Sequence, residues 1–119
     1  MACNNSGSTE ESKKLYDEIM KIHDEVMPKM GDIRKLSKQL KKIEDYQSID
    51  SIVVSLNDLD NAHESMMGWM AQFKMPKEIS NEEEMEFLNS QMKSVTVMKN
   101  TMLSALDRAE KEISKYLVQ

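Results

Sequence analysis

The chain has few of the residues that build sheets, disulfides and membrane spans. Its 119 residues include one cysteine, three glycines and two prolines, and aromatic side chains make up 5%. A lone cysteine cannot form an internal disulfide, and no apolar run approaches the roughly 20 residues that a helix needs to cross a bilayer. Few glycines and prolines leave few tight turns for an all-β fold. These absences favour an all-α protein.

Charge of one sign and the common catalytic motifs are also missing. The net charge is −5 with acidic and basic residues interleaved, so we expect no nucleic-acid partner. There is no H-E-x-x-H motif and no glycine-rich phosphate loop. The Glu-x-x-His pattern of di-iron bundles fails as well, because Asp60 precedes His63 and Met20 precedes His23 at that spacing. The sequence therefore predicts a protein without enzymatic activity.

Three stretches of the chain have helical periodicity. Apolar residues recur at spacings of three, four and seven over residues 10–44, 52–73 and 81–117. Thr9 or Ser8 is a candidate cap for the first helix, and residues 80–83 have the form of a capping box. Short connections then predict an up-down-up antiparallel bundle of three long helices. Residues 1–9 are expected to be a flexible leader, and residues 10–119 the bundle domain.

Two features of this bundle require comment. Pro28 lies inside the first helix, where its ring crowds the carbonyl of Asp24, so we expect a kink. The third helix is expected to be longer than its partners by about three turns, which leaves Ile113 and Leu117 to be covered. A homo-oligomer through this helix, or a tilt of the helix, would cover them, and the sequence does not choose.

Methionine is abundant, and two of its clusters repeat one signature. Residues 23–30 read HDEVMPKM and residues 63–70 read HESMMGWM, so both fit H-[DE]-x-x-M-x-x-M. At about 100° per residue, positions i, i+4 and i+7 fall within a narrow band on one helix face. Each copy therefore aligns one imidazole with two thioethers, which are His23, Met27 and Met30 in the first copy and His63, Met67 and Met70 in the second.

The predicted hairpin sets the two copies against each other. A turn near residues 46–47 places residue n beside about residue 93 − n, so His23 comes level with Met70 and Met30 with His63. The ends of one copy are too far apart along the helix to share an ion, so we expect two sites. The candidate metal ligands are His23, Met27 and Met70 at one site, Met30, His63 and Met67 at the other, and Met66, Met85 or Met92 completing either.

These residue types favour a soft metal ion. Thioether sulfur prefers Cu(I) or Ag(I) to zinc or calcium, and neutral imidazole adds a stronger donor. Because thiols are lost to oxidation outside the cytoplasm, methionine and histidine suit an extracytoplasmic site. Trp69 could shield the cation there, or it could point at solvent or at a neighbouring helix. The alternative is that methionine only fills the core. The chain would then be a helical scaffold or a partner-binding protein without metal.

The N-terminus and both signatures carry a resemblance. Cys3, ahead of the polar residues 4–8, looks like the acylated first residue of a mature bacterial lipoprotein; otherwise Cys3 is incidental. Together with residues 23–30 and the run MMGWMAQFKMP at 66–76, it is similar to a group of small Met-rich helical lipoproteins of Bacteroidota-type bacteria over nearly the whole chain. The resemblance implies a periplasmic or cell-envelope location with a lipid anchor on Cys3, and no settled activity.

Overall fold

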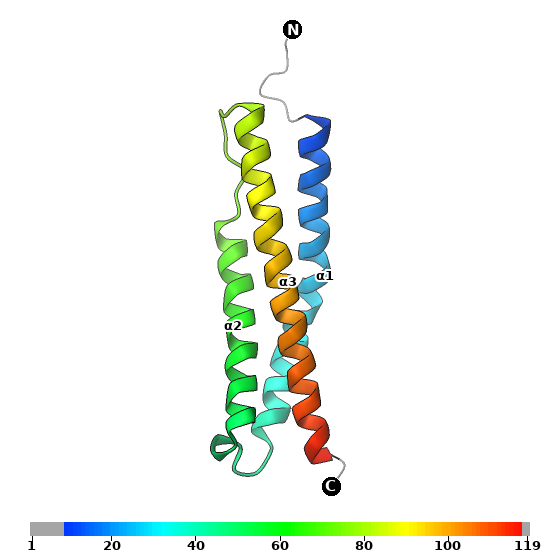
Figure 1. The fold of residues 1–119 in the computed structure, drawn as a ribbon, viewed down its shortest axis with the longest axis vertical. Coiled ribbons are helices and arrows are strands. Elements are labelled where there is room, and N and C mark those ends of the chain that lie inside the picture. Colours follow the sequence, from blue (N-terminus) through cyan, green and yellow to red (C-terminus); the bar gives the residue numbers. More distant parts are fainter. Residues whose placement is uncertain (1–8, 118–119) are drawn as a thin grey trace.

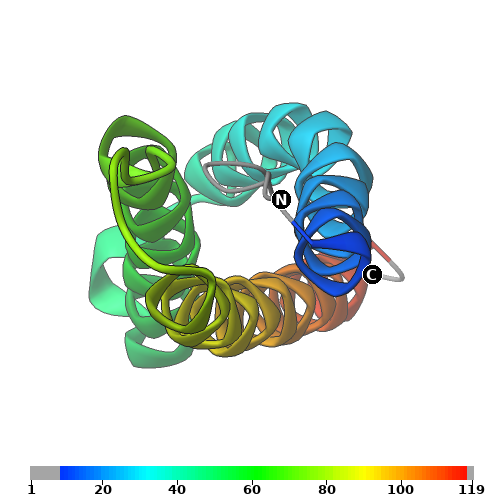
Figure 2. The same ribbon diagram turned by 90° about the horizontal axis from the view of Figure 1, so that it is seen from above.

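Three long helices account for most of the chain, as the sequence predicts. The computed structural model describes residues 9–117, with the side chain of Leu117 excepted. Helix α1 spans Glu10–Lys41, the short 3-10 helix η2 spans Tyr46–Ser48, α2 spans Asp50–Gln72 and α3 spans Asn81–Leu117. Consecutive long helices run in opposite directions; α3 lies between α1 and α2 in the upper half of Figure 1 and crosses in front of α1 below, and the three helices surround a common centre in Figure 2. The fold is an all-α, up-down-up bundle.

Local hydrogen bonds explain where two of the helices begin. The backbone N–H of Ser12 donates to Oγ1 of Thr9 at 3.0 Å, which makes Thr9 the cap of α1. Before α3, the N–H of Glu83 donates to the Ser80 hydroxyl and the N–H of Ser80 donates to the Glu83 carboxylate, both at 3.0 Å. This reciprocal pair confirms the predicted capping box.

The connections differ in length, and this determines the shape of the bundle. Asp45 adopts a left-handed backbone conformation, with φ of 59°, and starts the tight turn through η2 into α2. Between α2 and α3, residues 73–80 climb beside the first turns of α3 before the chain reverses (Figure 1). The upper end of the bundle is therefore built from α1, α3 and this connection.

The predicted length mismatch is wrong for α1. Helix α3 has 37 residues and α1 has 32, so these two differ by five residues, whereas α2 has 23. Ile113 is buried within the chain and lines the same surface pocket as Gln39 and Ile43. Its burial therefore requires no second copy of the protein.

Helix α1 continues through Pro28 without a break. The loss of one amide donor is accommodated by a change of direction in the middle of the helix, after which its second half passes behind α3 (Figure 1). The core below and above this bend is formed by aliphatic side chains and methionines from all three helices. None of the helices in residues 9–117 has an apolar stretch long enough to cross a membrane.

Candidate metal site

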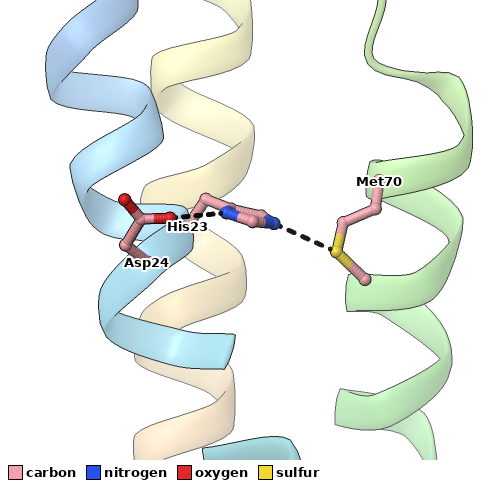
Figure 3. A network of polar contacts seen from close by, with 3 residues as sticks. All are labelled: His23, Asp24 and Met70. Carbon is pink, nitrogen blue, oxygen red and sulfur yellow. Dashed lines mark hydrogen bonds and ion pairs between the residues drawn. The ribbon is translucent and has the colours of Figure 1, made fainter. Parts of the chain in front are cut away.

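The centre of the candidate site is a contact between α1 and α2. The Nε2 atom of His23 lies 3.2 Å from the Sδ atom of Met70. Figure 3 shows the two side chains reaching toward each other from their helices. The two residue numbers sum to 93, so the predicted hairpin register is confirmed at this pair. The first histidine of one signature thus meets the last methionine of the other.

Asp24 determines which nitrogen of the His23 ring faces Met70. Its Oδ1 atom lies 3.1 Å from Nδ1 of His23, and because a carboxylate only accepts hydrogen bonds, Nδ1 carries a proton. In the neutral ring, Nε2 then presents a lone pair to the thioether, which also has no proton to give. In this tautomer a nitrogen and a sulfur donor face each other with no hydrogen between them, an arrangement that a soft cation would stabilise; when Nε2 carries a proton, it donates a hydrogen bond to the Met70 sulfur instead.

Trp69 lies beside His23 and is hydrogen-bonded to α3. Its indole N–H donates to Oε1 of Gln91 on α3 at 2.8 Å, and the side chain is buried. The centre of its ring lies 6.2 Å from the centre of the His23 ring. The hydrogen bond to Gln91 directs the indole toward α3, so of the three orientations predicted for Trp69, the one toward a neighbouring helix is confirmed.

An aromatic cluster extends from Trp69 toward the end of the bundle. Phe73 stacks on Trp69 with ring centres 4.7 Å apart, and it also stacks on Tyr16 at 6.0 Å and on Phe87 at 5.9 Å. The sequence analysis missed these three rings. A signal was present in the spacing of four residues between Trp69 and Phe73, which places both on one side of a helix. The cluster connects Trp69 of α2 with Tyr16 of α1 and Phe87 of α3.

Met27 and Met67 are exposed and lie one helical turn from His23 and Met70, respectively, and we call them the rim methionines. They are 38% and 49% exposed. Met27 follows His23 by one helical turn and Met67 precedes Met70 by one turn, so each shares the side of its helix with one member of the pair. Glu25, by contrast, pairs with a lysine of α3 and marks the other side of α1.

Two predicted ligands belong to the hydrophobic core. Met30 and Met66 are almost completely buried among aliphatic side chains of the three helices. In that position each fills space as a flexible apolar side chain. The two methionines thus have the surroundings that the alternative interpretation, core packing, predicts for them.

The remaining predicted ligands are half-buried and lie on other sides of their helices or further along them. Met85 and Met92 precede Lys99 by 14 and 7 residues and so lie on the same side of α3 as Lys99. Because Lys99 contacts Glu25 of α1 at 2.9 Å, these two methionines face α1 and not the His23–Met70 pair. His63 makes no polar contact with the described residues. Of the nine predicted ligands, His23 and Met70 are the two in polar contact within residues 9–117.

Carboxylates and imidazoles do not gather elsewhere in the described part of the chain. No group of three or more His, Cys, Asp or Glu side chains is close enough there to hold a metal ion. Such groups are what zinc and calcium sites require. The donor set at the pair is instead one imidazole and one thioether, with further thioethers nearby.

Comparison of the chain with protein-family models, with curated proteins and with solved structures finds no match. The resemblance to small envelope lipoproteins therefore rests on the sequence segments quoted above. Cys3 lies outside the described residues, so the lipid anchor stays a prediction.

Proposed function

We propose that this protein binds a soft monovalent metal ion, Cu(I) or Ag(I), in an extracytoplasmic compartment, and that His23 and Met70 are its principal ligands. The single observation that carries the proposal is the line from Asp24 through the His23 ring to Met70, with Nε2 and Sδ 3.2 Å apart. A carboxylate on the far nitrogen is the usual partner of a metal-binding histidine, since it orients the ring and raises the basicity of the other nitrogen.

The distance between the two donor atoms is compatible with a shared ion. Bonds from imidazole nitrogen and from sulfur to zinc are about 2.0–2.3 Å long, so two such donors on one ion lie about 3–4.5 Å apart. The 3.2 Å separation is at the short end of this range. A small rotation of the flexible Met70 side chain would therefore be enough to seat an ion.

The choice of ion follows from the donors. Neutral thioethers bind soft Cu(I) and Ag(I) but compete poorly with water for hard cations. Neither donor is destroyed by disulfide formation, which favours a site in the periplasm or cell envelope, with the chain held there by a lipid on Cys3. The membrane is a partner only through that lipid.

The test is an anaerobic titration of the full chain with Ag(I) or Cu(I), followed by the fluorescence of Trp69, the only tryptophan. We expect saturable binding that is weakened at least tenfold by His23→Gln or Met70→Leu, since each removes a ligand. His63→Gln is the matched control, because His63 has the same signature without a polar partner, and its titration should follow the wild type.

Two results would contradict the proposal. The first is unchanged affinity in both His23→Gln and Met70→Leu. The second is a wild-type chain that binds neither ion, which would leave the scaffold or partner-binding alternative for a bundle whose Met30 and Met66 already pack in the core.

A further inference from the structure

We infer that the rim methionines, Met27 and Met67, carry the ion between the surroundings and the His23–Met70 pair, and that they control the rate of exchange more than the affinity. This inference rests on the proposed function and assigns separate roles to two classes of thioether, an inner one that retains the ion and an outer one that transfers it.

The His23–Met70 pair is accessible to solvent. The Trp69 ring lies beside the His23 ring, with centres 6.2 Å apart, and is held by its hydrogen bond to Gln91 at 2.8 Å. The His23 side chain is 21% exposed, so the pair is partly open to solvent. Met27 and Met67, each one helical turn from a member of the pair, are exposed to the same solvent.

Met27 and Met67 are both exposed to solvent. At 38% and 49%, the rim methionines are among the most exposed large apolar residues of the described chain. Core packing does not account for thioethers in this position, whereas it does account for buried Met66. Exposed thioethers beside an inner donor pair are suited to meeting an incoming soft ion first.

The rim methionines are close enough to pass an ion to the His23–Met70 pair. His23 and Met27 are four residues apart on α1, and Met67 and Met70 are three apart on α2, so each rim methionine neighbours one inner donor at about 5–6 Å between Cβ atoms. Three rotatable bonds let a methionine swing its sulfur over such a distance. The hairpin register sets Met27 beside residue 66, one residue from Met67, so the two rim thioethers lie at nearly the same height.

Transfer in this arrangement is a sequence of ligand exchanges. The bond from the ion to a rim sulfur forms as its bond to the incoming carrier breaks, and the bond to Nε2 of His23 or Sδ of Met70 forms as the rim sulfur leaves. The metal stays in the monovalent state throughout. No proton has to leave the site when the His23 ring is neutral, because the proton stays on Nδ1, hydrogen-bonded to Asp24.

The experiment measures rates and affinity in the same chains. Stopped-flow fluorescence of Trp69 follows association of Ag(I) and its later removal by excess glutathione, in the wild type and in the double variant Met27→Leu, Met67→Leu. We expect both rates to fall about tenfold in the double variant, with the equilibrium affinity within about threefold of the wild type. Met98→Leu, a half-buried methionine on the α2-facing side of α3, is the control and should change neither.

The possible failures are distinguishable. Unchanged rates in the double variant would overturn the transfer role while leaving binding at the His23–Met70 pair intact. A loss of affinity as large as that of Met70→Leu would overturn it too, by making the rim methionines resident ligands. Absence of Ag(I) binding in the wild type would overturn the proposed function itself.

Discussion

At the scale of single residues, the account depends on Asp24. Its carboxylate favours the tautomer of His23 that has the proton on Nδ1, in which Nε2 is free to bind. Asp24 is 76% exposed, so this contact is screened by solvent and adds little to the stability of the fold. Its effect should be seen in metal affinity and not in unfolding.

The first prediction follows directly. Asp24→Asn should weaken Ag(I) binding about tenfold, because an amide supports the ring less strongly than a carboxylate does. Its free energy of unfolding should stay within about 0.5 kcal/mol of the wild type, as expected at an exposed position. Titration and urea denaturation measure the two effects. Glu64→Gln, at the equivalent place of the second signature, is the control. Equal affinities for Asp24→Asn and the wild type would remove the carboxylate from the account.

A second prediction concerns Ser55 in the middle of α2. Its side chain is completely buried, and its hydroxyl has no hydrogen-bond partner within the described residues. Ser55→Ala should therefore raise the free energy of unfolding by about 1 kcal/mol, since it removes an unsatisfied polar group. Ser65→Ala on the exposed side of α2 controls for helix propensity. A destabilised Ser55→Ala variant would show that the hydroxyl has a partner in solution.

Only part of the candidate site could be predicted from the sequence. The His23–Met70 contact could be predicted, because antiparallel register follows from the position of the turn. The division of the methionines into core, rim and pair could not. Buried Met66 and exposed Met67 are adjacent and chemically identical, and only the packing of α1 and α3 around α2 separates them. The orientation of Trp69 likewise depends on Gln91 of another helix.

At the scale of helices, the capping box sets the start of α3. Ser80→Ala should lower the free energy of unfolding by about 1 kcal/mol, because the N–H of Glu83 loses its acceptor and the reciprocal bond to Ser80 is weakened. Urea denaturation measures the change. Ser90→Ala, at an exposed position inside α3, should not destabilise the protein. If the two variants are equally stable, the box is not formed in solution.

The far end of α3 predicts a dependence of stability on pH. Glu112 is buried and accepts hydrogen bonds from Lys115 and from the Ser51 hydroxyl of α2, both at 2.8 Å. The hydrogen bond from Lys115 has the largest effect and lowers the pKa of Glu112. The bond from Ser51 lowers it further, whereas burial opposes both. The stabilisation is therefore present at pH values above the pKa of an unfolded glutamate, about 4.3. It is lost as the pH falls through the lower pKa of the folded state.

The corresponding variant is Glu112→Gln. We expect it to be less stable than the wild type at pH 7 and to lose less stability between pH 5 and pH 2, because it has no carboxylate to protonate at this site. Urea denaturation at a series of pH values measures both. The exposed Glu110→Gln is the control. If the free energies of unfolding of Glu112→Gln and the wild type fall in parallel between pH 5 and pH 2, Glu112 does not contribute to the loss of stability in acid.

Most helix boundaries were predictable because their signals are local. The cap at Thr9, the turn after residue 44 and the box at residues 80–83 are each encoded within a few residues. The error in relative lengths has a different origin. The prediction folded the chain sharply near residue 77, whereas residues 73–80 extend along α3 before it turns. An extended connection has no periodicity from which its path could be predicted.

At the scale of the whole molecule, an ion at His23 and Met70 would link α1 to α2 above their turn. A ligand that binds only the folded chain stabilises it, by about 2.7 kcal/mol at a concentration 100 times its Kd. Ag(I) should therefore raise the free energy of unfolding of the wild type. Met70→Leu should abolish this increase, although the apo variant should stay within about 1.5 kcal/mol of the wild type, since leucine conserves the volume. An equal increase in both proteins would point to another site.

The most direct measurement follows the ring nitrogens of His23 and His63 by long-range ¹H–¹⁵N NMR while Ag(I) is added to the ¹⁵N-labelled chain. The account predicts that the Nε2 resonance of His23 shifts and saturates at one equivalent, while its Nδ1 stays protonated and the His63 resonances move little. A shift confined to His63, or no shift at either ring, would contradict it.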